Sequence, residues 1–281
     1  MPELPEVETI SKRLSPVLSG KTINSIEVLR DKSFQGSPKL LIGKKILSVS
    51  RKAKLLVIDL DDSSSLVIHL KMTGQLIYQD KSQRLGGGHP TADWIDSLPS
   101  SHTRIVVKLI PNSTLFFNDM RVFGWIKHLS ETEVKKELSR YGPDIIDPIV
   151  TASYFLKKIS TTSRPIKVII MDSAIIAGVG NIYANDALNL ARINPSRPAK
   201  SLSKDEASLL LKAMLTVINL GIELGGATID NYRNIDGFSG NYQTKVRTYQ
   251  REGQPCFNCS ESIKKTKIGG RGTFFCPSCQ L

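Results

Sequence analysis

The pattern of apolar positions changes from a helical to a strand-like period near residue 20. Within 4–18 the apolar side chains recur at the spacing of one helix face, which predicts an α-helix: Leu4, Val7, Ile10, Leu14 and Leu18. Short apolar runs, each a candidate strand, then follow at 22–29, 46–50, 55–60, 65–70, 104–110 and 114–119. Turn-forming residues separate several of these runs. Short strands at such spacing predict an antiparallel β-sandwich.

The segment 81–101 interrupts this pattern. It contains three consecutive glycines and two prolines. Because these residues weaken regular structure, the segment is predicted to be a long, mobile insertion between strands.

The chain becomes helical after about residue 130. Ser130 and Glu133 fit a capping box, in which each side chain accepts a hydrogen bond from the other residue's backbone. The helix that they open ends at Gly142-Pro143 and has an apolar stripe of Val134, Leu138 and Tyr141. The N-terminal domain is therefore predicted to end near Asp147.

A second capping box opens a longer helix in the C-terminal half. Ser203 and Glu206 form it, and one face of the helix carries Leu210, Ala213, Met214, Val217 and Gly221. Gly225-Gly226 ends this helix, and the polar segment 230–245 is predicted to be a loop. These patterns predict an α+β protein. Its β-sandwich domain, with flanking helices, covers 1–147, a helical domain covers 148–246, and a third domain covers 247–281.

The four cysteines lie near the C-terminal end with the spacing C-x2-C-x16-C-x2-C: Cys256, Cys259, Cys276 and Cys279. Two tight C-x2-C turns can present four thiolates to one tetrahedral ion, as in a zinc ribbon. Two disulfides or four free thiols are the alternatives. Disulfides need an oxidising compartment, and residues 1–15 carry charges rather than the apolar run of a secretion signal. The spacing therefore predicts one structural zinc ion, since four thiolates leave no position open for water.

Length and charge narrow the class of protein. The 281 residues suffice for two domains, and no apolar stretch of 18 residues predicts a transmembrane helix. The formal net charge of +12 is uneven, with +4 in residues 1–150 and +8 in residues 151–281. A basic half suits a polyanion such as nucleic acid. Anionic lipid is the weaker alternative, because no basic amphipathic helix with an aromatic face is present.

The residues after Met1 read P-E-L-P-E-V-E at 2–8. Removal of Met1 would expose the secondary amine of Pro2, with Glu3 and Glu6 close in sequence. A terminal amine has a pKa of about 8, so much of it is a free base near neutral pH and can attack a sugar carbon to form an iminium. The alternative interpretation is structural, because proline suits the first turn of a helix.

Three further segments carry candidate chemistry. The stretch G-V-G-N-I-Y at 178–183 precedes a helical segment that ends near Ala191, so its N–H groups and Asn181 can hold a phosphate. A tight turn between helices is the alternative. The segments 69–74 and 121–124 follow predicted strands and carry apolar side chains that can wedge between base steps. The alternative for these side chains is the sandwich core.

Taken together, these features resemble the formamidopyrimidine-DNA glycosylase family, bacterial enzymes that excise oxidised purines. The resemblance spans nearly the whole chain. The opening at 2–8 is similar to that of the family, whereas the related endonuclease VIII group typically begins P-E-G-P-E, so Leu4 favours the oxidised-purine branch. The stretch 178–183 resembles the family's helix–two-turn–helix, and the cysteine spacing resembles its zinc-finger hairpin.

The resemblance implies a β-sandwich domain and a helical domain with DNA in the cleft between them. It implies that the Pro2 amine attacks C1′ of a flipped nucleotide, and that β- and δ-elimination then cut the strand on both sides of the sugar. Glu3 would act as acid and base, and Glu6 would support the terminus or a water. Lys54 matches a lysine of the catalytic region that binds phosphate beside the lesion.

Eight further residues match the family's DNA-contacting positions. Three would fill the space left by the extruded base: Met72, Arg121 and Phe123. Three match phosphate ligands: Lys167, Asn181 and Arg271. Two lie in the segment 227–245, which matches the loop over the extruded base: Thr228 and Tyr242.

Four features depart from the family's pattern. Lys71 stands where a smaller residue is common, Val122 replaces a residue that is often basic, and Gln250 occupies a position that is commonly glycine. The insertion at 81–101 is longer than usual. These departures bear on lesion preference and affinity rather than on the type of reaction.

The sequence thus predicts a DNA-repair enzyme, a bifunctional glycosylase and AP lyase that excises 8-oxoguanine and formamidopyrimidines from double-stranded DNA. A cytoplasmic, nucleoid-associated monomer with one zinc ion and no membrane partner is expected. Two alternatives stay open: an oxidised-pyrimidine glycosylase of the endonuclease VIII type, and a non-catalytic DNA-binding relative. Pro2, Glu3 and Lys54 argue against the latter, because DNA binding alone needs no free proline amine.

Overall fold

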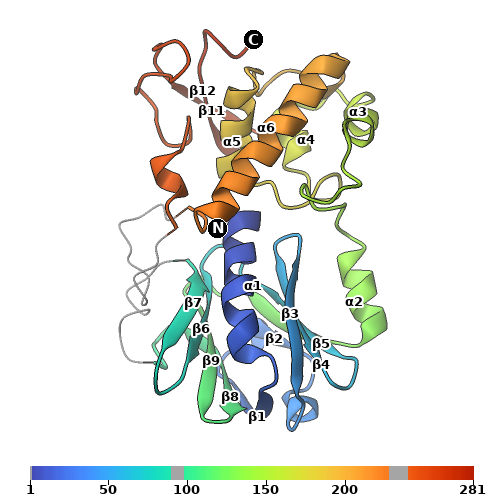
Figure 1. Cartoon of the computed structure of the whole chain (residues 1–281), viewed down its shortest axis with the longest axis vertical. Coiled ribbons are helices and arrows are strands. Elements are labelled where there is room, and N and C mark those ends of the chain that lie inside the picture. The colour runs from blue at the N-terminus through green and yellow to red at the C-terminus, as the bar shows by residue number, and fades with distance from the viewer. Residues whose placement is uncertain (1, 90–97, 228–239) are drawn as a thin grey trace. The chain divides into compact units, whose positions relative to one another are not determined.

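The computed structural model describes residues 2–89, 98–227 and 240–281. The chain folds into two compact units, drawn in Figure 1. The N-terminal unit comprises Met1–Ser139 and Leu224–Asn241. The C-terminal unit comprises Arg140–Glu223 and Tyr242–Leu281.

The N-terminal unit is a sandwich of two five-stranded sheets. One sheet has the order β1-β8-β9-β6-β7, with bounds Thr22–Val28, Thr103–Ile110, Ser113–Asp119, Gly74–Gln79 and Arg84–Gly88. The other has the order β2-β10-β5-β4-β3, with bounds Phe34–Gln35, Trp125–Leu129, Ser65–His69, Leu55–Leu60 and Ile46–Lys52. Neighbouring strands are antiparallel except β2 and β10, which are parallel.

Side-chain alternation along the strands builds the sandwich core. In the pairing of β6 with β9, Leu76 lies opposite Phe117 and Tyr78 lies opposite Leu115, and all four belong to the core. The intervening Ile77 packs in a separate cluster on the other face of the sheet. A shift of the strand by one position would turn its core side chains to the opposite face of the sheet. The apolar pattern therefore fixes the strand register.

Helix α1 (Leu4–Leu18) closes the open side of the sandwich. It contacts β3 and β7, the last strands of the two sheets, and Figure 1 shows it running between them. Four side chains on one face join the core: Val7, Ile10, Leu14 and Leu18. The helix thereby covers sheet edges that would otherwise expose unpaired backbone groups.

The six predicted strands and the first helix are confirmed, but β2, β6, β7 and β10 were not predicted. Residues on both faces of β6 are buried. The strand therefore lacks the alternation of apolar and polar side chains that predicts a strand from sequence. Strand β7 lies inside 81–101, so the expectation of an insertion without regular structure is wrong for 84–88. Its glycines fit where side chains cannot: a Cβ on Gly86 would lie 2.8 Å from the Leu76 carbonyl oxygen, and a Cβ on Gly87 would overlap Ile10. The part of the insertion at 90–97 lies outside the described residues.

Helices dominate the C-terminal unit. Its α-helices are α3 to α6, with bounds Ala152–Ile159, Ile166–Ile170, Asn181–Leu190 and Lys204–Glu223. Helix α6 packs against α3 and α5, and α5 also contacts a β-hairpin made of β11 (Lys264–Ile268) and β12 (Arg271–Phe275). Short 3-10 turns occur in both units at Asp31–Ser33, Pro38–Leu41, Ala199–Ser201 and Tyr242–Thr244.

Both predicted capping boxes are confirmed. The Ser130–Glu133 pair opens α2 (Glu131–Leu138) in the N-terminal unit. At the start of α6, the Ser203 N–H donates to Glu206 at 2.8 Å and the Glu206 N–H donates to the Ser203 hydroxyl at 3.2 Å. Across the described ranges, no helix is both long enough and apolar enough to cross a membrane.

Gly87 of β7 provides a test of how α1 packs against the sandwich. Gly87→Ala should lower the free energy of unfolding by about 1–3 kcal/mol, because the added methyl group would overlap Ile10 and overpack the core. Tryptophan fluorescence during urea unfolding measures this, since both tryptophans belong to the N-terminal part of the sequence. Gly272→Ala is the control, because its Cβ would meet only Phe274, at 3.8 Å. An unchanged midpoint for Gly87→Ala would contradict the packing described here.

Candidate active site and zinc centre

The start of α1 holds the residues nearest the N-terminus in a fixed geometry. Glu3 is the N-cap of the helix, and its side chain accepts a hydrogen bond from the Glu6 N–H. The Glu6 carboxylate in turn accepts from the Glu3 N–H at 2.7 Å. Pro2 and Glu3 are both buried. The structural role considered for this segment is therefore present, because Glu3 caps the helix that follows Pro2.

Glu6 also joins this segment to residues near the far end of the unit's sequence. Its second carboxylate oxygen accepts from the Ala227 N–H at 2.7 Å. The preceding Gly226 has φ +89°, and a Cβ there would lie 2.8 Å from the Glu6 carboxylate, so only glycine fits easily. Glu6 thus supports the terminus through backbone contacts. Thr228 lies outside the described residues.

Lys54 lies in the turn between β3 and β4, which is tied to α1. The Arg51 guanidinium donates to Glu8 of α1 at 2.7 Å and to the Ala53 carbonyl oxygen at 2.9 Å. Partial burial opposes ionisation of Glu8, but the neighbouring Arg51 and Lys12 lower its pKa below the usual value. This ion pair fixes the turn that carries Lys54 relative to the helix that carries Glu3.

His69 lies at the end of β5 and is neutral at physiological pH. Burial, with further contributions from the positive charges of Lys71 and Lys54, lowers its pKa to about 3. Its Nδ1 atom accepts a hydrogen bond from the Lys71 N–H at 3.0 Å, and its ring meets Trp125 edge-on at 5.7 Å. The imidazole therefore acts here as a hydrogen-bond acceptor that shapes the β5–β6 turn.

The three residues proposed to fill an emptied base stack lie together. The Arg121 guanidinium donates to the Met72 sulfur at 3.3 Å and lies 4.8 Å from the centre of the Phe123 ring. Met72 is 41% exposed and Phe123 is 46% exposed. The alternative that they belong to the sandwich core is wrong. Two turns, one after β5 and one after β9, present them on the surface.

The three single-residue departures from the family's pattern share one backbone feature. Lys71, Val122 and Gln250 have φ values of 51°, 54° and 58°, in the left-handed region. Glycine adopts this region without a steric penalty, which explains why a smaller residue or glycine suits positions 71 and 250. A β-branched valine at such a φ is unusual and strained.

Lys167, predicted to be a phosphate ligand, is buried in the C-terminal unit. Only 1% of it is exposed. Its ammonium donates to Asn185 at 3.2 Å, to the Gly272 carbonyl oxygen at 3.0 Å and to the Thr273 hydroxyl at 2.8 Å. A lysine ammonium has three donors, so these acceptors use all of them. In this structure Lys167 ties α4 and α5 to the β-hairpin.

Asn181 and Arg271 lie at the same junction. Asn181 is the first residue of α5, and its side-chain amide donates to the Gly272 carbonyl oxygen at 3.1 Å. Arg271 begins β12 and is exposed, beside a cavity of about 170 Å³ that Arg164 and Asp172 also line. The structure therefore brings a helix N-terminus and an exposed guanidinium together. Both features attract anions.

Tyr242, predicted to lie in the loop over the extruded base, is an internal anchor. It is 1% exposed, its hydroxyl donates to Asp186 at 3.0 Å, and its ring lies 4.6 Å from that of Tyr183. Asp186 also accepts from the Thr248 N–H at 2.9 Å, and burial raises its pKa. Asp186 thus connects both ends of the segment 242–248 to α5. Because it is buried and bonded to Asp186, the Tyr242 hydroxyl is not available to DNA in this structure.

Two buried carboxylates, Asp119 and Asp186, escaped the sequence analysis. Each is 0% exposed. In the sequence, both aspartates lie among apolar residues. Asp119 ends the run 114–119, and Asp186 lies inside the helical segment after residue 180. Aspartate is rarely fully buried unless it is paired, so each position indicated a hydrogen-bonding hub.

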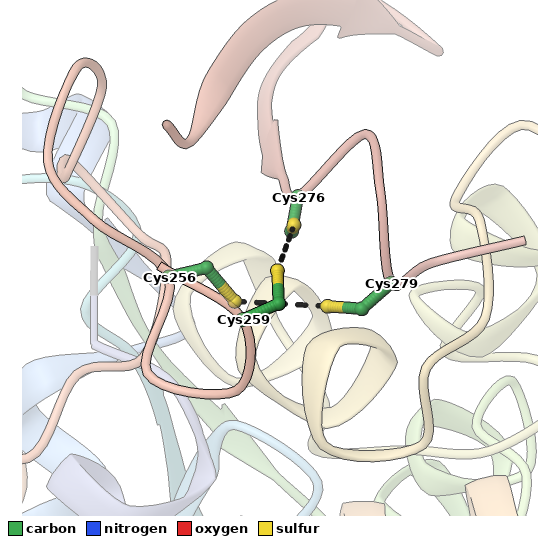
Figure 2. A group of neighbouring side chains, drawn as sticks. All are labelled: Cys256, Cys259, Cys276 and Cys279. Atoms are coloured by element: carbon green, nitrogen blue, oxygen red, sulfur yellow. Dashed lines mark hydrogen bonds between the residues drawn. The ribbon is translucent and has the colours of Figure 1, made fainter. Parts of the chain in front are cut away.

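The four cysteine side chains converge, as Figure 2 shows. Their sulfurs all lie within 4.8 Å of one another, with Cys256 to Cys279 at 3.6 Å and Cys259 to Cys276 at 3.4 Å. A disulfide needs about 2.05 Å, whereas a tetrahedral zinc ion separates its sulfurs by roughly 3.8 Å. The disulfide alternative is therefore wrong, and the donor set fits one structural zinc ion. Burial, with hydrogen bonds among the cysteines, raises the pKa of Cys279 to about 12, so a cation is needed to keep all four ionised.

Family models match three consecutive parts of the chain. The formamidopyrimidine-DNA glycosylase N-terminal domain matches residues 1–126, the H2TH domain of the same enzymes matches 141–233, and the zinc finger found in FPG and IleRS matches 253–281. Formamidopyrimidine-DNA glycosylases from Pelotomaculum thermopropionicum and Thermus thermophilus are each 37% identical to this chain. These alignments cover all of it and 99% and 98% of the relatives. The chain belongs to the formamidopyrimidine-DNA glycosylase family.

Solved structures of family members agree with this fold over the whole chain. The MutM (FPG) protein of Thermus thermophilus has a TM-score of 0.85 at 36% identity, covering 99% of this chain and 98% of that one. A Lactococcus lactis FPG mutant in complex with Fapy-dG containing DNA has a TM-score of 0.88 at 29% identity, with both chains fully covered. The predicted sandwich, helix–two-turn–helix domain and zinc-finger hairpin are thus confirmed.

Glu6 can be tested through the amide of Ala227. In Glu6→Gln one oxygen becomes an NH2 group, so either the Glu3 or the Ala227 N–H loses its acceptor. Hydrogen exchange at one of these amides should accelerate about tenfold or more, because a hydrogen bond to a charged group contributes roughly 1.5–3 kcal/mol. Glu8→Gln, on the same helix, should leave both amides unchanged. Equal protection in both variants would refute the connection.

The zinc site can be tested with a single ligand substitution. Wild-type protein should contain one zinc ion per chain, and Cys276→Ser should lose it. Zinc binding and folding of such sites are coupled, so the thermal unfolding midpoint of the C-terminal unit should fall. Ser278→Ala, between the two ligands of the second turn, should keep one zinc ion. Metal analysis and calorimetry measure this, and a metal-free wild type with an intact hairpin would contradict the assignment.

Proposed function

We propose that this protein is a bifunctional DNA glycosylase and AP lyase that excises oxidised purines from double-stranded DNA, with the amine of Pro2 as nucleophile. The observation that carries the proposal is the similarity to formamidopyrimidine-DNA glycosylases over the full chain, including the P-E-L-P-E-V-E segment at the start of α1. One of the similar structures is a complex of a Lactococcus lactis FPG mutant with Fapy-dG containing DNA.

The chemistry begins with removal of Met1, which frees the Pro2 nitrogen. This nitrogen attacks C1′ of the damaged nucleotide, and the base leaves with the electron pair of the glycosidic bond and takes a proton. The Pro2 nitrogen then loses the proton that it carried. Opening of the sugar transfers the C1′–O4′ electron pair to O4′, which takes a proton, while the Pro2 nitrogen and C1′ form an iminium. The iminium makes the C2′–H bond acidic. Loss of that proton expels the 3′ phosphate, and a second elimination expels the 5′ phosphate.

Glu3 is the proposed proton donor to O4′ and the acceptor of the C2′ proton. Its position at the N-cap of α1, next to Pro2, supports this role. Lys54 is proposed to hold the phosphate beside the lesion, and Glu6 to keep the N-terminal segment in place. Positioning of this kind converts an encounter in solution into a reaction within one complex.

Access to the damaged base requires flipping, which costs a few kcal/mol of stacking and pairing energy. Met72, Arg121 and Phe123 are proposed to occupy the vacated stack, which offsets part of this cost. Asn181 and Arg271 are proposed to hold phosphates. Lys167 and Tyr242 would contribute indirectly, through the internal hydrogen bonds that hold α5, the hairpin and the chain near 242–248 together.

The proposal also concerns the setting in which the enzyme works. The named relatives are bacterial proteins, and a bacterial chromosome lies in the cytoplasm, so we place this protein there, at the nucleoid. One chain carries every proposed catalytic residue, so a monomer suffices.

Borohydride trapping tests the reaction. Processed protein is incubated with a duplex that contains 8-oxoguanine opposite cytosine, and borohydride is added. Reduction of the iminium should leave a covalent protein–DNA adduct on wild type, and Pro2→Gly should weaken it strongly, because a primary amine replaces the constrained secondary amine of proline. Pro5→Ala is the matched control, because Pro5 lies in the first turn of α1, close to Pro2 in sequence, but its nitrogen is an amide.

The outcome also separates the alternatives. An adduct only with oxidised pyrimidines would indicate the endonuclease VIII type of activity. DNA binding without an adduct on any lesion would indicate a non-catalytic relative. Mass spectrometry of the same sample establishes whether Met1 is absent, and protein that retains Met1 should form no adduct.

A further inference from the structure

Asp119, at the end of β9, is a hydrogen-bonding hub beneath the surface. It is fully buried, and its carboxylate accepts four hydrogen bonds from residues of two turns. One oxygen accepts from the Phe123 N–H at 2.8 Å and from the Gly124 N–H at 2.6 Å. The other accepts from the Arg121 N–H at 3.2 Å and from the hydroxyl of Thr73.

Thr73 links the two turns that carry the exposed side chains. Its hydroxyl donates to Asp119 and accepts from the Arg121 N–H at 3.0 Å. Thr73 follows Met72 directly, so the link passes from the turn after β5 to the turn after β9. The contacts of Asp119 and Thr73 therefore determine where Met72, Arg121 and Phe123 lie.

Both turns contain backbone that does not form easily. Lys71 and Val122 have left-handed φ values, although neither is glycine. The second turn is also tight, because a Cβ on Gly124 would lie 2.8 Å from the Phe117 ring and 3.1 Å from the Asp119 carboxylate. Strained backbone persists where surrounding bonds hold it, and Asp119 and Thr73 supply such bonds.

We infer that Asp119, acting through Thr73, is a positioning residue that holds Met72, Arg121 and Phe123 as one preassembled unit for entry into a base stack. This inference rests on the proposed function. It assigns the hub to the opening of an intact duplex and not to the chemistry of Pro2. Steps that need a base to be extruded should depend on Asp119, whereas attack on an abasic site already outside a stack should not.

Two substrates separate these steps. The first is a duplex with 8-oxoguanine opposite cytosine, whose excision requires extrusion. The second is a single strand with one abasic site, where the Pro2 amine meets an open sugar without a stack to enter. Single-turnover excision is followed on the first and borohydride trapping on the second, both with full-length, zinc-containing protein.

Two variants weaken the hub. Asp119→Asn replaces one acceptor oxygen with an NH2 group, so at least one backbone N–H loses its acceptor. Thr73→Val keeps the side-chain shape and removes the linking hydroxyl. Each should slow duplex excision by about 10- to 100-fold, the range expected for misplacement of contacting groups by about an ångström. Trapping on the single strand should change less than about threefold, clearly below that positioning range.

Two controls distinguish positioning from general stability. Thr73→Ser restores the hydroxyl and should recover most duplex excision. Ser65→Ala removes another hydroxyl-to-carboxylate hydrogen bond of the same unit, the partly buried one from Ser65 to Asp59 at 2.9 Å, and should leave the ratio of the two rates unchanged. Equal losses on both substrates in the Asp119 and Thr73 variants, or no loss on either, would overturn the inference.

The experiment also keeps the two proposals apart. If wild type neither excises 8-oxoguanine from the duplex nor is trapped on the single strand, the proposed function fails and the inference falls with it. If wild type reacts with both substrates and the variants excise 8-oxoguanine from the duplex as fast as wild type does, only the inference fails. Should Asp119→Asn not fold, the Thr73→Val and Thr73→Ser pair decides, because these substitutions leave the carboxylate in place.

Discussion

The structure depends most on how the first helix is held. A chemical group at the end of a chain is normally mobile, and α1 removes that freedom by burying one face in the sandwich. Leu4, Leu14 and Leu18 are 0% exposed, and the Glu3–Glu6 capping box closes the helix at its first turn. Glu3 and Glu6 of the cap thus hold each other's backbone in place at the start of the helix. Burial of one apolar face thus supplies both folding energy and positioning.

In the C-terminal unit, buried charged side chains hold the elements together, as apolar packing does in the N-terminal unit. The C-terminal unit places a lysine ammonium and an aspartate carboxylate where solvent hardly reaches, and each is surrounded by hydrogen-bond partners. Lys167 joins two helices to the zinc hairpin, and Asp186 joins α5 to the chain that leads into it. Breaking such a buried interaction on one side is costly because it leaves a charge without compensation. Both therefore fix the elements that carry exposed groups such as Arg271.

The departures from the family's residue pattern acquire a physical meaning in the structure. In sequence they are three unrelated substitutions at 71, 122 and 250. In space all three occupy left-handed backbone, and two of them border the exposed Met72 and Phe123. At positions 71 and 122, a residue other than glycine raises the free energy of the turn. The hydrogen bonds around Asp119 offset this strain.

Local patterns determined much of this protein from sequence alone. The capping boxes, the first helix, six strands and the cysteine pairs depend on residues two to four positions apart, and the chain's opening sequence indicated its family. Tertiary structure decided the rest, because the partners are remote: Glu6 meets Ala227 across 221 positions and Lys167 meets Gly272 across 105. No local period reveals that a glycine-rich segment pairs as β7, or that Tyr242 points inward. A side chain's role follows from its acceptors and neighbours, and only the folded chain brings those together.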